Sequence, residues 1–269
     1  MLRLTGRPHY TLWAREIGGI HFKERTGQFF PIYYLDVDVT DAPVESRDPV
    51  QVDVRIRLGK HLAADGSVDR IISEAWTEVT STAADGRPLR LGGTHKQAVF
   101  TRPDPDPEKR KVRVLHPSLG LGELPAREIH PFSKEDLLAA PEGFVPREEL
   151  LDAEAHVWSY QQTDPNGHVH AMDYVRVMEA FVADQLARTG VPDGDRFFGR
   201  ARVVFRRPCF AGEWYRRRAR RFLGPHGEQV LIGSIEPVAG PDDAARGRAA
   251  TVIQLWQGVA KKSLQSRSR

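Results

Sequence analysis

Polar residues of complementary chemical types gather in the stretch 164-DPNGHVHAMDYVRVMEA-180. Asp164, Asn166 and His168 stand at alternate positions, and a second histidine, His170, follows. A carboxylate can attack a carbonyl or activate water, an imidazole can transfer protons, and an amide can hold a substrate oxygen. These residue types at this spacing therefore suit attack on a carbonyl group.

A helix that begins at the first of these residues would position them. Asp164 is a good N-cap, Pro165 suits the first helical position, and Gly190 marks the end. Apolar residues follow at helical spacing, namely Val169, Met172, Val175, Phe181, Val182 and Leu186, with Val177 and Met178 beside them. The pattern predicts an amphipathic helix that buries one face and carries the polar group at its N-terminus.

The N-terminus of such a helix offers a place for negative charge. Its first backbone N–H groups lack intrahelical acceptors, and the helix dipole is positive there. We therefore expect the N–H groups near Gly167 and His168 to stabilise an oxyanion formed from the carbonyl. Glu179 lies further along the same helix, on roughly the face of Met172, and is a further candidate catalytic carboxyl group.

Each of these polar residues also has an ordinary structural role open to it. The alternatives are helix capping for Asp164, a loop contact for Asn166, a bonded and partly buried side chain for His168, His170 and Tyr174, and a surface ion pair for Glu179. Their occurrence together favours chemistry, because a purely structural helix does not need so many polar groups at one end.

Two copies of one pattern make up the remainder of the chain. Period-two alternation of apolar and charged residues predicts antiparallel strands with one buried and one solvated face. The first copy has strand-like runs at 29–39, 50–59, 70–81 and 94–102, and the second has them at 197–205, 213–224, 229–238 and 249–259. Corresponding runs lie about 160 residues apart. A helical segment precedes each set, and the first, 10–17, is short and is followed by Gly18-Gly19.

One helix followed by antiparallel strands, repeated twice, predicts an α+β fold. We expect a first repeat at 1–102, a connection at 103–150 and a second repeat at 151–262 that carries the polar helix. The connection is rich in proline and charge, with one short helix near Ser133 to Ala139. A strand at 155–162 is expected to deliver the chain to Asp164.

The polar stretch resembles the signature of hotdog acyl thioesterases. In that signature an Asp, an Asn and a His stand at offsets 0, 2 and 4, followed by Val and, at offset 10, by Tyr. The matching residues here are Asp164, Asn166, His168, Val169 and Tyr174. The pattern is similar to that of plant and bacterial acyl-acyl carrier protein thioesterases, which are double hotdogs with the motif in the second copy. Asp164-Pro165, Gly167, Val169 and Tyr174 are likewise similar to 4-hydroxybenzoyl-CoA thioesterases.

The chain departs from this signature in two respects. His170 and Ala171 replace a pair of Asn residues, so His170 becomes a candidate second base. The first copy lacks an Asp-x-Asn-x-His run, which implies one active site per chain. The related hydratases carry their His at offset 5, where this chain has Val169, and this difference argues against hydration or dehydration.

The resemblance implies a double hotdog that hydrolyses acyl thioesters of acyl carrier protein or coenzyme A. Asp164 would attack or activate water, while Asn166 and His168 would position the thioester and the water. The expected catalytic residues are Asp164, Asn166, His168, His170 and Glu179, and the expected substrate-binding residues are Gly167, Val169, Tyr174, Arg206, Arg207, Arg216 and Arg218. The arginines would receive the phosphates of coenzyme A or the acidic face of the carrier. No cofactor and no metal are expected.

Two other functions remain open at this point. The first is acyl transfer or another thioester-processing reaction of a polyketide or fatty-acid-type pathway. The segment 8–22 is loosely similar to double-hotdog acyltransferase/decarboxylases, and that reading would move the site to Tyr10 or His21. The second is a hotdog without catalytic activity that binds acyl carriers.

Composition excludes several classes of protein. The single cysteine, Cys209, excludes an internal disulfide and a cysteine-rich metal site, and the cytoplasm is the default location. A signal peptide and a membrane span are not expected, because the first residues contain no apolar run of signal-peptide length and the sequence has no apolar run long enough to span a membrane. The run 216-RRRARR-221 is typical of a half-exposed strand or an anion-docking surface. It has no interleaved aromatic residues, so nucleic-acid binding is not expected. A homodimer is left open.

Overall fold

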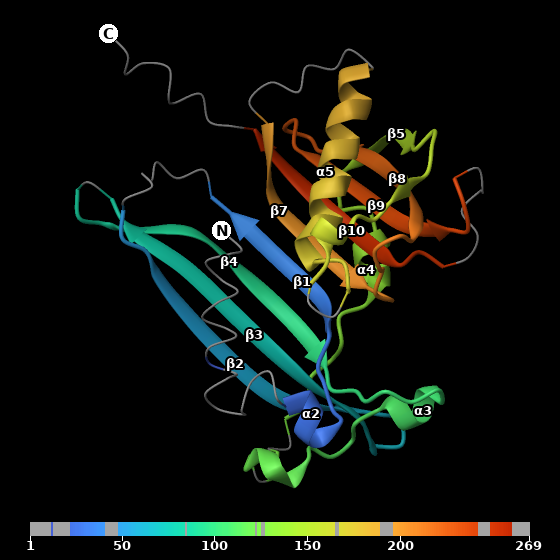
Figure 1. The fold of residues 1–269 in the computed structure, drawn as a ribbon. Coiled ribbons are helices and arrows are strands. Elements are labelled where there is room, and N and C mark those ends of the chain that lie inside the picture. The colour runs from blue at the N-terminus through green and yellow to red at the C-terminus, as the bar shows by residue number, and fades with distance from the viewer. Residues whose placement is uncertain are drawn as a thin grey trace. The chain divides into compact units, whose positions relative to one another are not determined.

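The computed structural model describes residues 12, 22–40, 48–83, 85–121, 123–124, 127–164, 167–188, 196–241 and 248–259. The chain divides into two compact units, residues 1–132 and 133–269, and this boundary falls inside the expected connection. Figure 1 shows the elements of both units. The helix expected at 10–17, together with Tyr10, His21 and Asn166, lies outside the described residues, apart from helical Leu12.

The first unit is built mainly from long strands. Its elements in chain order are α2 (Phe22–Thr26), β1 (Ile32–Val39), β2 (Gln51–Leu62), β3 (Val68–Thr82), β4 (Pro88–Val99), α3 (Pro107–Arg110) and the 3-10 turn η2 (Pro117–Leu119). The strands pair antiparallel in the order β2-β3-β4-β1. A core cluster consists of the buried residues Phe22, Ile71, Phe100, Val112, Leu115 and Leu119. All four runs that the alternation predicted form strands, because one face of each run is apolar and can be buried.

The second unit repeats this strand order. Its elements are α4 (Lys134–Leu138), β5 (Val145–Leu151), β6 (His156–Val157), η3 (Tyr160–Gln162), α5 (Ala171–Arg188), β7 (Arg196–Phe205), β8 (Trp214–Leu223), β9 (Gln229–Val238) and β10 (Thr251–Val259). The order β8-β9-β10-β7 matches β2-β3-β4-β1, and β5 and β6 both pair with β8. The predicted α+β fold with two copies of one pattern is therefore confirmed.

The helix α5 packs on the sheet of the second unit (Figure 1). Its buried side chains are Tyr174, Val175, Met178, Phe181, Val182 and Leu186, and burying each contributes about 1.5–3 kcal/mol. Gly233 on β9 allows this close approach. A Cβ atom there would lie 2.6 Å from the carbonyl oxygen of Arg218 and 3.0 Å from Cε of Met178. A larger residue would clash first with the backbone of β8 and would also press on the Met178 side chain of α5.

The predicted start of this helix is wrong. The sequence pattern placed the N-cap at Asp164, whereas α5 begins at Ala171. Gly167 has φ of 77°, in the left-handed region, which is incompatible with a continuous right-handed helix. Asp164, Gly167 and His168, which were expected in the first helical turns, instead lie in a tight turn ahead of the helix.

The connection between the repeats contains both expected and unexpected structure. Ser133 caps α4 in a capping box with Asp136, which confirms the short helix predicted there. β5 was not predicted, because VPREELL has a proline and several charges instead of period-two alternation. The strand expected at 155–162 is reduced to β6, since η3 follows it. Among the described residues, no helix combines the length and apolarity needed to cross a bilayer.

Candidate active site

The turn before α5 holds Asp164 and His168, two of the predicted reactive residues. Thr163 and Val169 form an antiparallel bridge. Between them the Asp164 N–H donates to the His168 carbonyl at 2.8 Å, and the Gly167 N–H donates to the Asp164 carbonyl at 2.9 Å. The positive φ of Gly167 closes the turn at a backbone conformation that other residues rarely adopt. The chain is thus folded back on itself and not helical at these residues.

Asp164 and His168 are in direct contact within this turn. One carboxylate oxygen of Asp164, Oδ1, accepts the backbone N–H of His168 at 3.1 Å, and both residues are half-buried. The N–H groups of Gly167 and His168, which were expected to face an oxyanion, therefore already have acceptors on Asp164. The oxyanion position that the sequence suggested is not supported, because the helix that would have left these groups unpaired starts later.

A neighbouring segment fixes the far side of the turn. His168 forms a backbone bridge with Phe210, and the two rings meet edge to face with centroids 5.1 Å apart. The Val169 N–H donates to the Cys209 carbonyl at 2.8 Å. Phe210 is 40% exposed, so the histidine ring lies beside a partly accessible apolar surface. Neither Cys209 nor Phe210 was predicted to neighbour the motif, because nothing local in the sequence marks them as its neighbours.

Tyr174 supports this arrangement from the core. Its hydroxyl oxygen accepts the backbone N–H of Cys209 at 2.9 Å, and its ring lies between Trp158 and Phe205 at 5.1 Å and 5.4 Å. Burial raises the pKa of this hydroxyl far above its usual range. Burial also raises the pKa of the Cys209 thiol, which disfavours the nucleophilic thiolate. In this geometry Tyr174 positions the segment that contacts His168.

Of the remaining predicted catalytic residues, His170 lies just before α5 and Glu179 lies within it. His170 is exposed immediately before the helix, and its backbone N–H donates to the Gln162 carbonyl at 2.8 Å. Glu179 is eight residues after Ala171, which is roughly 12 Å along the helix axis. Burial raises the pKa of Glu179, despite the opposing charge of Arg176. The structure thus groups Asp164, His168 and His170 and separates Glu179 from them.

The four predicted substrate-binding arginines all have protein partners. A guanidinium N–H of Arg206 donates to the Ala249 carbonyl at 3.3 Å, Arg207 pairs with Glu213 at 3.2 Å, Arg216 donates to the Pro241 carbonyl at 3.3 Å, and Arg218 pairs with Glu149 at 3.4 Å. Arg207, Arg216 and Arg218 are at least partly exposed and retain donors that can reach an anion. These arginines can therefore still bind an anion, although each already contacts a group of the protein.

A buried ion pair beside α5 was missed in the sequence. The guanidinium group of Arg217 donates to both carboxylate oxygens of Asp152, at 2.8 Å and 2.9 Å, and to the Val177 carbonyl at 2.9 Å. Its centre lies 4.9 Å from the ring centroid of Phe181. The available signal was the period-two spacing of β8: Arg217 lies two residues from Tyr215 and therefore shares its inward face. This pair ties α5 to the sheet.

No family model and no curated protein matches the sequence. Among solved structures, a protein of Lactobacillus plantarum described as an oleoyl thioesterase aligns over 97% of this chain and 88% of its own, with TM-score 0.63 and 13% identity. An acyl-ACP thioesterase from Bacteroides thetaiotaomicron aligns over 93% and 85%, with TM-score 0.56 and 12% identity. The 12:0-ACP thioesterase from Umbellularia californica aligns over 96% and 88%, with TM-score 0.56 and 11% identity. The chain is a double hotdog. At these identities the likeness establishes the thioesterase-like fold, which agrees with the fold that the motif implied.

Proposed function

We propose that this double hotdog hydrolyses acyl thioesters carried by acyl carrier protein or coenzyme A. The observation that carries the proposal is the contact between the Asp164 carboxylate and the His168 backbone in a turn directly ahead of α5. This contact fixes a carboxylate and an imidazole-bearing residue at one place in the second unit. The likeness of the fold to solved thioesterases supports the same class of reaction.

The proposed reaction uses the turn as its chemical centre. In one route Asp164 removes a proton from a water that attacks the thioester carbonyl; in the other Asp164 attacks the carbonyl itself, and water then hydrolyses the mixed anhydride and restores the carboxylate. In both routes the carbon–sulfur bond breaks, the leaving thiolate takes up a proton, and the acyl group leaves as a carboxylic acid. Asn166 and His168 hold the thioester and the water, and exposed His170 serves as a second base. Gly167 and Val169 shape the turn, while Tyr174 positions the segment beside it.

The oxyanion is best placed at the observed start of α5. The first N–H groups of a helix lack intrahelical acceptors, and the positive end of the helix dipole lies there. The N–H groups at Ala171 and Met172 therefore take the role that the sequence pattern gave to Gly167 and His168. Glu179 has no part in the chemical step of this proposal, because about two turns of helix separate it from the turn.

Arginines of the second unit would recognise the carrier. Arg216 and Arg218 lie at alternate positions of β8 and therefore share one face of the strand. Arg206 and Arg207 directly follow the last residue of β7. The guanidinium groups can bind phosphates of coenzyme A or carboxylates of a carrier protein.

The decisive test follows free thiol released from acyl-CoA and acyl-carrier substrates. Asp164→Asn keeps the size of the side chain but removes its basic and nucleophilic character, so we expect kcat to fall by about 100-fold or more. The matched control is Asp184→Asn, an exposed carboxylate on α5 that pairs with Arg188. We expect the control to retain wild-type kcat.

Each other outcome leads to a different function. Full thiol release by Asp164→Asn contradicts the assignment of Asp164. Transfer of the acyl group to an added acceptor, without hydrolysis, identifies an acyltransferase. Saturable binding of acyl carriers with neither reaction identifies a hotdog that binds without catalysis.

A further inference from the structure

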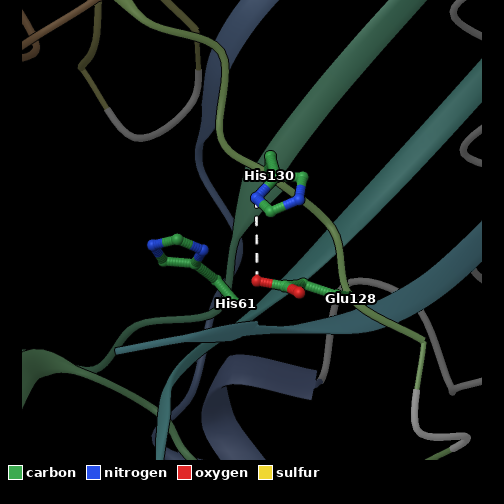
Figure 2. A group of neighbouring side chains, drawn as sticks. All are labelled: His61, Glu128 and His130. Carbon is green, nitrogen blue, oxygen red and sulfur yellow. Dashed lines mark ion pairs between the residues drawn. The ribbon is translucent and has the colours of Figure 1, made fainter. Parts of the chain in front are cut away.

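Three residues with metal-binding side chains converge in the first unit. They are His61 at the end of β2 and Glu128 and His130 in the later connection, each contributing one ligand atom, and these atoms all lie within 4.8 Å of one another. Figure 2 shows the imidazole of His61 facing the Glu128 carboxylate and the His130 ring. These residues play no part in the proposed hydrolysis.

Backbone contacts hold the two segments together at this point. Lys60 forms a parallel bridge with Glu128. The Lys60 N–H donates to the Arg127 carbonyl at 3.0 Å, and the Ile129 N–H donates to the Lys60 carbonyl at 2.9 Å. Because Glu128 and His130 are two residues apart on this extended segment, they project on the same side as each other. The cluster is thus set by strand-like pairing and not by chance contact of long side chains.

Gly59 makes the close approach of the segments possible. A Cβ atom at this position would lie 2.6 Å from Cγ1 of Ile129 and 2.7 Å from the Arg127 carbonyl oxygen. Any other residue would force the segment away from β2 and would separate the histidines. Gly59 is not a ligand, but its lack of a side chain keeps the three ligand residues close together.

The side chains themselves fit a cation. Nδ1 of His130 lies 3.6 Å from Oε1 of Glu128, too far for a good hydrogen bond but suitable for two ligands of one ion. Nδ1 of His61 is buried and, within the part of the chain that the structure describes, has no hydrogen-bond partner. Buried imidazole nitrogens normally have a partner. The side chains of Glu128 and His130 are 41% and 77% exposed, so an ion can enter from solvent.

We propose that His61, Glu128 and His130 bind a divalent transition-metal ion, with Zn²⁺ as the best match. Two imidazole nitrogens and one carboxylate are typical Zn²⁺ ligands, whereas Ca²⁺ and Mg²⁺ prefer sites made of oxygen atoms. Three protein ligands leave a fourth position for water or another ligand. A bound ion would cross-link residues 127–130 to β2. No metal was expected from the sequence, because His61 is far from Glu128 and His130 in the chain and the three residues form no recognisable spacing motif.

The test is metal binding by the full chain after removal of metals with a chelator. Isothermal titration with Zn²⁺ should show one site per chain, and Co²⁺ should give visible absorption bands of low-symmetry coordination. His130→Gln should weaken Zn²⁺ binding by about tenfold or more. Because the His130 side chain is largely exposed, the substitution should not disturb the fold. His61→Gln and Glu128→Gln should act in the same direction. The matched control is His226→Gln, an exposed histidine of the second unit, which should bind as the wild type does.

Two results would overturn the proposal. One is the absence of saturable Zn²⁺ and Co²⁺ binding by the wild-type chain. The other is binding that His61→Gln and His130→Gln leave unchanged, which would place the ion elsewhere. Stronger binding of Mg²⁺ or Ca²⁺ than of Zn²⁺ would also contradict the assigned class of ion.

Discussion

At the scale of single residues, the buried carboxylate of Glu74 in the first unit is held ionised by its neighbours. His95 contributes Nε2 at 3.2 Å, Gln97 donates from Nε2 at 2.6 Å, and Arg57 donates from Nε at 2.5 Å. Burial by itself would raise the pKa of Glu74, but these hydrogen bonds outweigh it and lower the pKa from 4.5 to about 2. The interaction stabilises the folded chain only while the carboxylate is ionised.

Replacing this carboxylate should reveal the sign of its contribution. Because the folded-state pKa lies below the unfolded value, the stabilisation is present above pH 4.5 and is lost as pH falls toward about 2. Glu74→Gln should lower the free energy of unfolding by about 2 kcal/mol at pH 7, with a difference that shrinks through that acid range. Urea unfolding of both proteins at several pH values measures this difference in the free energy of unfolding. Glu78→Gln, an exposed carboxylate on the same strand, is the control, and a loss at Glu74 that does not depend on pH would refute this account.

At the scale of elements, the turn ahead of α5 depends on a residue that tolerates left-handed backbone. Gly167 has φ of 77°, and Gly227 in the turn between β8 and β9 has φ of 87°. Among the atoms of the described residues, none lies within 4 Å of a Cβ built on either glycine, so substitution there meets mainly backbone strain. The two glycines therefore have similar backbone φ values and open surroundings, but only Gly167 lies beside the proposed reactive residues.

Alanine at each glycine separates stability from activity. We expect Gly167→Ala and Gly227→Ala each to lower the free energy of unfolding by about 1 kcal/mol, because the strained conformation is the same. Only Gly167→Ala should also lower kcat for thiol release, since it moves Asp164 relative to His168. Thermal unfolding and the thiol assay measure the two effects. Equal activity in both variants would show that the turn does not set the reactive geometry.

At the scale of the whole molecule, a formal net charge of +3 and a high arginine content favour anionic partners. Arg218 is exposed and Arg216 is half-buried on one face of β8. Salt screens such contacts over a distance of about 8–10 Å at ordinary ionic strength. Binding of an acidic carrier through this face should therefore weaken as salt increases.

Removing the two charges tests this docking face. The double variant Arg216→Gln with Arg218→Gln should raise KM for the acyl-carrier substrate by about 3- to 10-fold, leave kcat unchanged and flatten the salt dependence of KM. The control is Arg188→Gln, an exposed arginine that pairs with Asp184 on α5. A KM that is the same in wild type, double variant and control would place the carrier on another surface.

Local physics allowed the sequence alone to determine the strands that show period-two alternation, the repeat and the place of the motif, but not β5. Alternation of apolar and charged residues predicts a strand wherever one face can be buried, and the run 229–238 coincides with β9. A cap such as Ser133 acts on its own backbone neighbours, so it marked α4 correctly. For the same reason the segment that contains Asp164 and His168 could be found without a structure.

Tertiary structure decided the geometry, because that depends on groups far apart in the chain. The left-handed turn at Gly167 moved the start of α5 to Ala171 and paired the Asp164 carboxylate with the His168 amide. The convergence of His61 with His130 required pairing of β2 with a distant segment. Such contacts depend on how the sheet and its connections close on one another, and a sequence pattern carries no record of which distant residues will meet.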